Sequence, residues 1–279
     1  MVNRSRLKYK AFTRNPMGLT EKRDHLFHII QELPGSAVAF SGGVDSTLLA
    51  SVVHEVQGTE AVALTVDSAF VSRSEMDGAF WAAAEIGITH QVITLKEIDE
   101  QILANPTDRC YHCKKVIFGR LLETAHKMGK QVLLEGTNLD DLDDYRPGLK
   151  AVKELEVRSP LLEAQLTKEE IRQLSRSRGL STWKHVSMAC LASRIPYNDL
   201  ITPESLQMVE QAESFLKTMG LKGLRVRKHG SIARIEVSAD ERSLFFDLTL
   251  METVSRELKK IGFQFVTLDL EGYRTGSLN

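Results

Sequence analysis

Seven residues near the start of the chain combine a tight turn with side chains suited to hold a phosphate group. They read Ser-Gly-Gly-Val-Asp-Ser-Thr over positions 41–47, between an apolar run and an apolar helix. Adjacent glycines let the backbone bend sharply and approach a ligand closely. The free N–H groups of the first helical turn, beside three hydroxyl side chains, form an anion nest. The Asp45 carboxylate would repel phosphate unless a Mg²⁺ ion lies between them.

This loop differs from two other phosphate-binding motifs. A Walker A loop ends in Gly-Lys-Ser/Thr, and a dinucleotide fingerprint needs a third glycine, so neither matches. The alternative of a plain strand-to-helix turn would not need the whole hexapeptide. Ser-Gly-Gly-x-Asp-Ser in this context resembles the PP-loop of the ATP pyrophosphatases, which cleave ATP to AMP and pyrophosphate. By this resemblance the ATP-binding residues are Ser41, Gly42, Gly43, Asp45, Ser46 and Thr47.

Two of the three cysteines form a C-x-x-C pair, Cys110 and Cys113, at an expected helix start. The positive end of a helix favours the thiolate form of a cysteine. Three kinds of chemistry compete for such a pair: a redox couple, a structural zinc completed by a histidine, or an iron–sulfur cluster held by three thiolates. Two thiols with no shared role are the remaining alternative.

The third thiol, Cys190, lies in a polar, turn-rich stretch between His185 and Arg194. A lone cysteine is usually a small buried apolar residue. Here the neighbouring basic residues predict an electropositive pocket that favours thiolate. Cys190 is therefore a candidate nucleophile or metal ligand.

A group of basic residues follows in the last third of the chain. Arg225 and Arg227 alternate along one expected strand, so they share a face of it. Arg234 and His229 lie on or beside the next strand. Such a cluster can bind a phosphate or carboxylate through bidentate hydrogen bonds. A solvated, charged surface is the alternative interpretation.

The elements that must position these residues alternate along the first two thirds of the chain. Short apolar strands separated by amphipathic helices predict an α/β fold with a doubly wound, mostly parallel sheet. The loop at 41–47, the C-x-x-C pair and Thr137 would then meet at the carboxyl edge of that sheet. Capping boxes at Ser72-x-x-Glu75 and Thr167-x-x-Glu170 predict two helix starts. The later strands and helices, which end in an expected strand at 265–270, predict a smaller C-terminal α+β domain. We expect a basic mobile tail at 1–17, a PP-loop domain at 18–196 and the smaller domain at 197–279.

The composition narrows the classes of function. The chain has 279 residues, of which 36 are basic and 37 acidic, for a net charge of −1. This balance disfavours nucleic acid as a partner. No apolar run reaches the length of a membrane span. Three cysteines indicate no disulfide framework and favour a reducing cytoplasm. The basic N-terminal stretch lacks the apolar segment of a secretory signal.

Beyond the loop, nearly the whole chain resembles the LarE family of ATP-dependent sulfur transferases in nickel-pincer nucleotide cofactor synthesis. The resemblance is carried by Asp-Tyr-Arg-Pro-Gly-Leu-Lys-Ala at 144–151, Cys-Leu-Ala-Ser-Arg at 190–194, Arg-Val-Arg at 225–227, Ile-Ala-Arg-Ile-Glu at 232–236 and Val-Thr-Leu-Asp-Leu-Glu-Gly-Tyr-Arg at 266–274. The PP-loop alone indicates a superfamily, whereas these later runs indicate this family.

The resemblance implies that ATP adenylates a carboxylate of a pyridinium-3,5-biscarboxylic acid mononucleotide, and that a sulfur nucleophile then displaces AMP. Mg²⁺ would offset the phosphate charge. Ser193, Arg194, Arg225 and Arg227 match the part that would hold the substrate phosphate or the reacting carboxylate. Relatives in this family form homo-oligomers, and we expect the same here.

The sulfur source divides the family. One branch uses a single cysteine, at the position of Cys190, which gives up its sulfur and becomes dehydroalanine. Another branch carries three cysteines that resemble the ligands of a 4Fe–4S cluster, as Cys110, Cys113 and Cys190 do here. We favour the cluster as the sulfur source and keep the sacrificial cysteine as the alternative.

Two other classes of protein remain alternatives for the function as a whole. A tRNA thiolase with a PP-loop and three cysteines is a second alternative. A nucleotide-binding zinc or redox sensor is a third.

Overall fold

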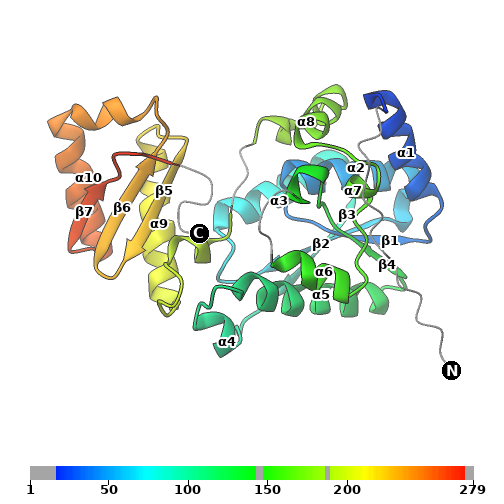
Figure 1. Ribbon diagram of the computed structural model, residues 1–279, viewed down its shortest axis with the longest axis horizontal. Coiled ribbons are helices and arrows are strands. Elements are labelled where there is room, and N and C mark those ends of the chain that lie inside the picture. The colour runs from blue at the N-terminus through cyan, green and yellow to red at the C-terminus, as the bar shows by residue number, and fades with distance from the viewer. Residues whose placement is uncertain (1–16, 143–146, 186–188, 274–279) are drawn as a thin grey trace.

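The computed structural model describes residues 17–142, 147–185 and 189–273. Its larger unit is built on a four-stranded sheet in the order β3-β2-β1-β4, with every pairing parallel (Figure 1). Such pairing requires a crossover between successive strands, which the helices provide. The strands are β1 Ser36–Ala39, β2 Val62–Asp67, β3 Thr89–Thr94 and β4 Val132–Leu134.

Helices cover both faces of this sheet, as the doubly wound prediction requires. Neighbouring strand residues point to opposite faces: Val38 packs in the cluster formed with α1, α2, α3, α7 and α8, whereas Ala37 packs in the cluster formed with α5 and α6. The helix bounds are α1 Leu19–Gln31, α2 Val44–Gln57, α3 Arg73–Ile86, α4 Glu100–Leu103, α5 Arg109–Lys127, α6 Gly148–Glu154, α7 Pro160–Glu163 and α8 Lys168–Ser177.

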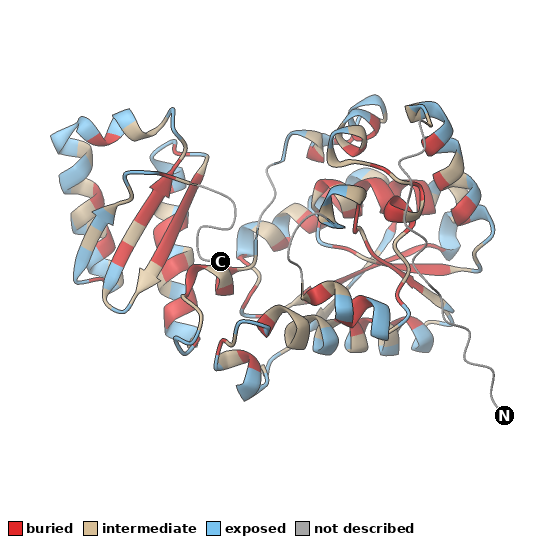
Figure 2. Ribbon diagram, in the orientation of Figure 1, coloured by how far each residue is buried: buried red, intermediate tan, exposed pale blue. Residues whose placement is uncertain are grey.

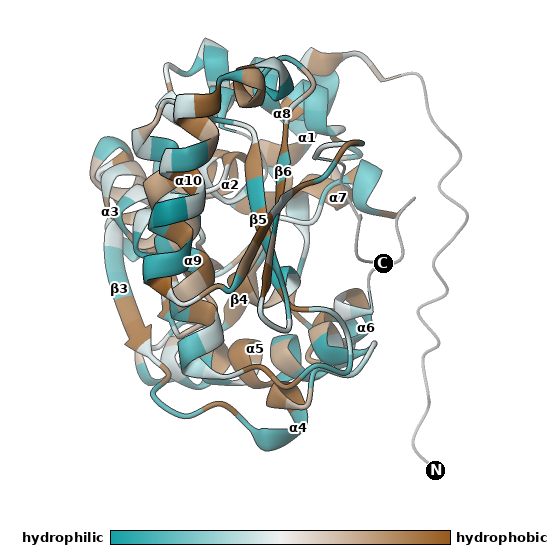
Figure 3. Cartoon of the chain, turned by 90° about the vertical axis from the view of Figure 1, so that its left-hand side faces the viewer, coloured by the Kyte–Doolittle hydropathy of each residue, from teal (hydrophilic) through white to brown (hydrophobic). Residues whose placement is uncertain are grey.

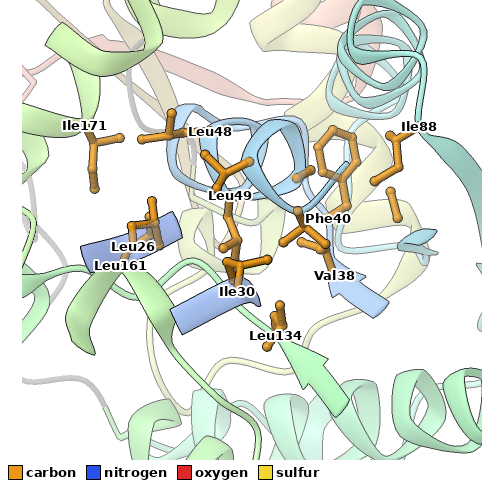
Figure 4. Close-up of a cluster of buried hydrophobic side chains, with 14 of the residues drawn as sticks. Leu26, Ile30, Val38, Phe40, Leu48, Leu49, Ile88, Leu134, Leu161 and Ile171 are labelled. Carbon is orange, nitrogen blue, oxygen red and sulfur yellow. The ribbon is translucent and has the colours of Figure 1, made fainter. Parts of the chain in front are cut away.

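Helix α2 lies at the centre of the first cluster. Figure 4 shows Leu48 and Leu49 of this helix among side chains from α1, β1, β4 and α8. Both leucines are almost completely buried. Full burial of a leucine contributes about 1.5–3 kcal/mol to stability. The helix that begins in the 41–47 loop is therefore anchored along its length, which makes its first turn a rigid platform.

The smaller unit is a three-stranded mixed sheet in the order β5-β6-β7, packed on two helices. Strands β5 and β6 are antiparallel, and β6 and β7 are parallel. Apolar residues of one face pack against both helices (Figure 2). Most residues of β5 and β6 are buried, whereas those of β7 are exposed or half-buried. The elements are α9 Pro203–Thr218, β5 Leu224–His229, β6 Ile232–Val237, α10 Leu248–Ile261 and β7 Phe265–Leu268.

A fourth apolar cluster joins the two units. It brings Phe70 and Ile102 of the larger unit against residues 191–201 and against Leu206 and Val209 of α9. Cys113 and Cys190 pack at the border of this cluster. The division at residue 196 stays a prediction.

The predicted fold class is confirmed, and both predicted capping boxes are present, at Ser72 and at Thr167. The sequence missed the short helices α4, α6 and α7. The last strand is shorter than the predicted 265–270, because the Asp269 side chain accepts hydrogen bonds from two following N–H groups and closes a turn. The expected tail at 1–17 lies outside the described residues except for Met17, as do residues 144–146 and 274 of the family-like runs.

A half-buried histidine supports the strand that leads into the loop. The Thr65 hydroxyl donates to the carbonyl of Phe40 at 2.7 Å and lies 2.7 Å from Nε2 of His90. The ring of His90 meets Phe40 and Phe80 edge to face. Burial lowers the pKa of His90 below its ordinary value. The folded protein therefore prefers the neutral ring.

We predict an acid sensitivity that depends on this histidine. The unfolded chain binds the proton more readily, so the His90 contribution is full above a pH of about 6.5 and falls as the pH decreases below it. Urea unfolding of the wild type at neutral and mildly acidic pH should show this loss, and His90→Gln should reduce it. The exposed His126→Gln is the control. An unchanged pH dependence in His90→Gln would contradict the prediction.

Candidate active site

The loop at 41–47 connects the carboxyl end of β1 to the first turn of α2. Gly43 is the N-cap residue of α2, and no side chain caps this helix start. The first N–H groups of a helix lack partners within the helix. The positive end of the α2 dipole lies at the same place. The local geometry therefore suits a phosphate group.

Two serine hydroxyls hold the loop closed. Ser46 donates to the carbonyl of Gly43 at 3.1 Å, and its oxygen accepts from the N–H of Ser41 at 3.2 Å. The hydroxyls of Ser41 and Ser46 are 3.1 Å apart, and the Ser41 hydroxyl accepts from the N–H of Gly43 at 3.3 Å. Ser41 is exposed, whereas Ser46 is buried. Ser41 can therefore turn toward a ligand while Ser46 keeps the loop in shape.

Gly42 is required by both conformation and space. Its φ is +70°, a region that other residues rarely adopt. A Cβ at this position would lie 2.6 Å from Cα of Ala79 and 2.8 Å from its nitrogen, both backbone atoms of α3. Gly136, after β4, is also tight, because a Cβ there would lie 3.2 Å from N of Ser46. The loop is thus confined from both sides by backbone.

Asp45 is paired with a lysine from a distant helix. Its carboxylate contacts the ammonium group of Lys168, the first residue of α8, and accepts from the side chain of Asn138 at 3.3 Å. The backbone N–H of Lys168 donates to Asp140 at 2.7 Å. Both Asp45 and Lys168 remain partly exposed. The loop therefore holds a positive and a negative group side by side, each accessible to a ligand.

Sequence reasoning missed Lys168. The capping box at Thr167 predicted the start of α8, but nothing in the sequence indicates that this helix begins beside the loop. In contrast, Thr47 was predicted to contact the nucleotide, and its hydroxyl is buried without a hydrogen-bond partner among the described residues. In this conformation the Thr47 hydroxyl does not face solvent.

The three thiols come together from two segments. Cys110 and Cys113 lie in the first turns of α5, and Cys190 directly precedes a 3₁₀ turn at Leu191–Arg194. All three are partly buried and free. Burial, with the nearby thiols of Cys190 and Cys110, raises the pKa of Cys113 to about 12. Each thiol is thus within electrostatic reach of the others, which a shared role would need.

The charges of two arginines affect the pKa of these thiols. Burial raises the pKa of Cys190 above its ordinary value, while the charges of Arg109 and Arg194 oppose this effect. The expected electropositive surroundings are present, but desolvation outweighs them. In the metal-free protein the Cys113 and Cys190 thiols are therefore protonated at neutral pH. A bound metal would reverse this, because a metal ion deprotonates a coordinating thiol.

Arg194 anchors the Cys190 segment. It forms a two-pronged ion pair with Glu213 of α9, with contacts of 2.9 and 3.1 Å, and both side chains are nearly inaccessible. Its other nitrogen donates to the carbonyls of Ala189 and Cys190 and to the Ser193 hydroxyl. The Ser193 hydroxyl donates in turn to the Cys190 carbonyl at 2.8 Å. Arg194 thus shapes the loop in this conformation, and its role toward substrate stays a prediction.

Arg225 and Arg227 share one face of β5, as their alternation predicted, and both are buried. Arg227 pairs with Glu236 at 3.0 Å and donates to the carbonyl of Ser193 at 2.7 Å. Arg225 lies over the ring of Tyr273, 4.9 Å from its centre. Burial and the neighbouring Arg194 charge lower the pKa of Arg225. An anion beside Arg225 would offset both effects.

Among the described residues, no group of three or more His, Cys, Asp or Glu side chains is arranged to hold a metal ion. Cys110, Cys113 and Cys190 as metal ligands therefore stay a prediction. Within the described part of the chain, no helix is both long and apolar enough to cross a bilayer.

Comparison with known proteins agrees with this architecture. The asparagine synthase family model matches residues 35–137, which contain the loop and all four strands of the parallel sheet. The fold and the loop together define a PP-loop enzyme that uses ATP.

Two relatives match over almost the full length. An uncharacterized protein of Synechocystis sp. is 42% identical over 94% of this chain and 98% of its own length. The pyridinium-3,5-bisthiocarboxylic acid mononucleotide synthase of Lactiplantibacillus plantarum is 37% identical over 94% of this chain and 95% of its own length. The chain therefore belongs to the LarE family of ATP-dependent sulfur transferases. A tRNA-specific 2-thiouridylase of Trichlorobacter lovleyi is 33% identical over only 36% of this chain and 32% of its own length.

We predict that Gly42→Ala disrupts the loop. The substitution combines a left-handed backbone, which costs about 1–2 kcal/mol, with a collision against the backbone of α3. Gly87→Ala is the matched control, because Gly87 has a similar φ of +78° but only an ordinary contact at 3.8 Å. ATP binding measured by calorimetry should be lost in Gly42→Ala and kept in Gly87→Ala. Equal binding in both variants would show that the close approach does not matter.

Proposed function

We propose that this enzyme uses ATP to convert a carboxylate of pyridinium-3,5-biscarboxylic acid mononucleotide into a thiocarboxylate. The observation that carries the proposal is the gathering of Cys190, Cys110 and Cys113 in a chain whose PP-loop defines a nucleotide site. The substrate carboxylate attacks the α-phosphorus of ATP, forming an acyl-adenylate and releasing pyrophosphate. A sulfur nucleophile then attacks the carbonyl carbon, and AMP leaves with the electrons of the broken C–O bond.

The loop residues would hold the pyrophosphate portion of ATP. The N–H groups at the start of α2 and the Ser41 hydroxyl donate to phosphate oxygens, and Lys168 supplies a positive charge. Oxygen ligands of the kind offered by Asp45 and Asp140 suit Mg²⁺, so the residues present fit this ion. When bound, Mg²⁺ would neutralise phosphate charge. Lys168 would then exchange its contact with Asp45 for one with phosphate.

The other end of the site would hold the nucleotide substrate. Arg225 is a buried guanidinium whose lowered pKa reflects desolvation and a neighbouring positive charge. A substrate phosphate or carboxylate would stabilise that charge through hydrogen bonds. Ser193, whose hydroxyl is partly buried beside Cys190, would orient the reacting carboxylate. Arg194 and Arg227 would keep this segment and β5 in place.

The sulfur chemistry depends on the three cysteines. A 4Fe–4S cluster with one open iron needs three thiolates, and Cys110, Cys113 and Cys190 are the donors we assign. They fit, because they are sulfur donors near one another, and because mutual repulsion contributes to the raised pKa of Cys113. When bound, the cluster would supply sulfide to the reaction.

A sacrificial Cys190 is the second candidate route. The Cys190 sulfur would attack the acyl-adenylate to form a thioester, and elimination would then release the thiocarboxylate and leave dehydroalanine. This route gives Cys110 and Cys113 no role, which disfavours it. A tRNA substrate is less favoured, because the 2-thiouridylase match spans only a third of either chain.

We also propose that the chain forms a homo-oligomer, in part through the small unit. Large apolar side chains are exposed near and on α10, with Phe246 86% and Leu248 72% exposed. Figure 3 shows the mixture of apolar and polar residues on this helix. Large exposed apolar patches typically mark interaction surfaces.

We assign residues 18–196 to the ATP-binding domain and 197–279 to the substrate and oligomerisation domain.

We predict that Asp45→Asn lowers the rate of pyrophosphate release by about 100-fold or more, because the loop would lose its proposed Mg²⁺ ligand. Lys168→Met should raise KM for ATP by about tenfold, since one charge-assisted phosphate contact is lost. The exposed Lys127→Met is the control. Pyrophosphate release should be measured with and without the pyridinium substrate. Full activity of Asp45→Asn would exclude the loop as the ATP site. ATP binding without any pyrophosphate release would instead favour a nucleotide sensor.

We predict that Cys113→Ser abolishes sulfur transfer and the binding of iron. The wild type, purified without oxygen, should hold about four irons and matching acid-labile sulfide per chain. Iron analysis and an absorption spectrum on one sample test this. The sacrificial route predicts a different result, in which Cys113→Ser completes one turnover and Cys190 loses the elements of H₂S. Intact-mass measurement distinguishes the two.

A further inference from the structure

A buried asparagine connects the C-x-x-C helix to the Cys190 segment. Asn105 lies between α4 and α5, is fully buried and has a φ of +58°, which asparagine adopts more readily than most residues. Its side-chain nitrogen lies 3.3, 2.6 and 3.1 Å from the carbonyls of Ile195, Pro196 and Asp199. The two amide hydrogens are therefore fully used on one segment.

Arg109 extends this contact to both cysteine-bearing segments. Arg109 is 3% exposed, and its guanidinium donates to the side-chain oxygen of Asn105 and to the carbonyl of Ala192 at 3.1 Å. It also lies 5.4 Å from the ring centre of Tyr197. Arg109 directly precedes Cys110, and Ala192 is two residues after Cys190. One side chain thus joins the two stretches of chain that carry the thiols.

Backbone hydrogen bonds reinforce the same junction. The N–H of Asn198 donates to the carbonyl of Asn105 at 2.8 Å, and the N–H of Ile201 donates to that of Leu103 at 2.8 Å. Near Cys190 itself, Arg109 of α5 donates to the carbonyl of Ala192, and Glu213 of α9 holds the segment through its ion pair with Arg194.

We propose that Asn105 and Arg109 are positioning residues that hold Cys190 against Cys113 and Cys110. The assignment rests on the proposed sulfur-handling role of the three thiols, but its structural content stands apart from that role. Without these side chains, the segments would still be covalently intact and α5 would still form. The distance between Cys190 and the C-x-x-C pair would then vary, and a group that needs all three sulfurs would bind weakly.

The test measures thiol proximity in the metal-free full chain. Cys110→Ser leaves Cys113 and Cys190 as the two remaining thiols, so phenylarsine oxide, which bridges two thiols, must join the two segments. We expect this background chain to bind one arsenical. Adding Asn105→Gly, which keeps the positive φ, or Arg109→Met should weaken binding by about tenfold or more, because buried hydrogen bonds are lost.

Two control variants separate positioning from a general loss of stability. Leu121→Ala removes a buried side chain of α5 that packs against the sheet, so it should lower stability and leave arsenical binding unchanged. Arg120→Met changes an exposed arginine of α5 and should change neither property. All chains are compared at a temperature where circular dichroism reports them folded. Arg109→Lys replaces Arg109→Met if the latter unfolds.

Two results would overturn the proposal. In the first, the folded Asn105 and Arg109 variants bind the arsenical as tightly as the background chain. In the second, the background chain itself does not bind it. Because binding is measured without ATP, substrate or metal, failure of the proposed sulfur transfer would leave this measurement unaffected, and the two failures are distinguishable.

Discussion

The buried ion pair between Arg194 and Glu213 is the interaction on which the candidate site most depends. Arg194 follows Cys190 by four residues, whereas Glu213 belongs to α9 and also accepts the N–H of Val226 in β5 at 3.1 Å. The pair therefore joins the Cys190 segment, helix α9 and the small sheet at one point. Removing one partner would leave an uncompensated buried charge, which costs about 3–5 kcal/mol in comparable cases. The two units are consequently held together by charge as well as by apolar packing.

A second constraint is where each sheet places its polar residues. In the parallel sheet, strand polarity brings the ends of β1 and β4 to the same edge, where Asp45 and Asn138 meet. In the small sheet, successive side chains of a strand point to opposite faces, so apolar side chains pack against the helices and the arginines lie on the other face. The carbonyl of Ser193 lies against that face, bonded to Arg227. A nucleotide, a substrate anion and a sulfur donor could thus be served by neighbouring surfaces.

Local patterns in the sequence were enough to predict the fold class, the PP-loop, both capping boxes and the shared face of Arg225 and Arg227. Each depends on residues close together in the chain. The pairings of Asp45 with Lys168, and of Arg194 with Glu213, were not predictable, because they join residues that only the folded chain brings together. Asn105 was missed for the same reason, since its role depends on carbonyls some ninety residues away. Short helices such as α4 carry too few residues for a periodic signal.

The central claim is that ATP cleavage by this enzyme is coupled to sulfur transfer onto a pyridinium carboxylate. The most direct test quantifies AMP and the thiocarboxylated nucleotide by mass spectrometry in one anaerobic reaction supplied with sulfide. The account predicts that AMP forms only when the pyridinium mononucleotide is present, and in equal amount to the new thiocarboxylate. AMP formation independent of that nucleotide, or sulfur incorporated into tRNA in its place, would contradict it.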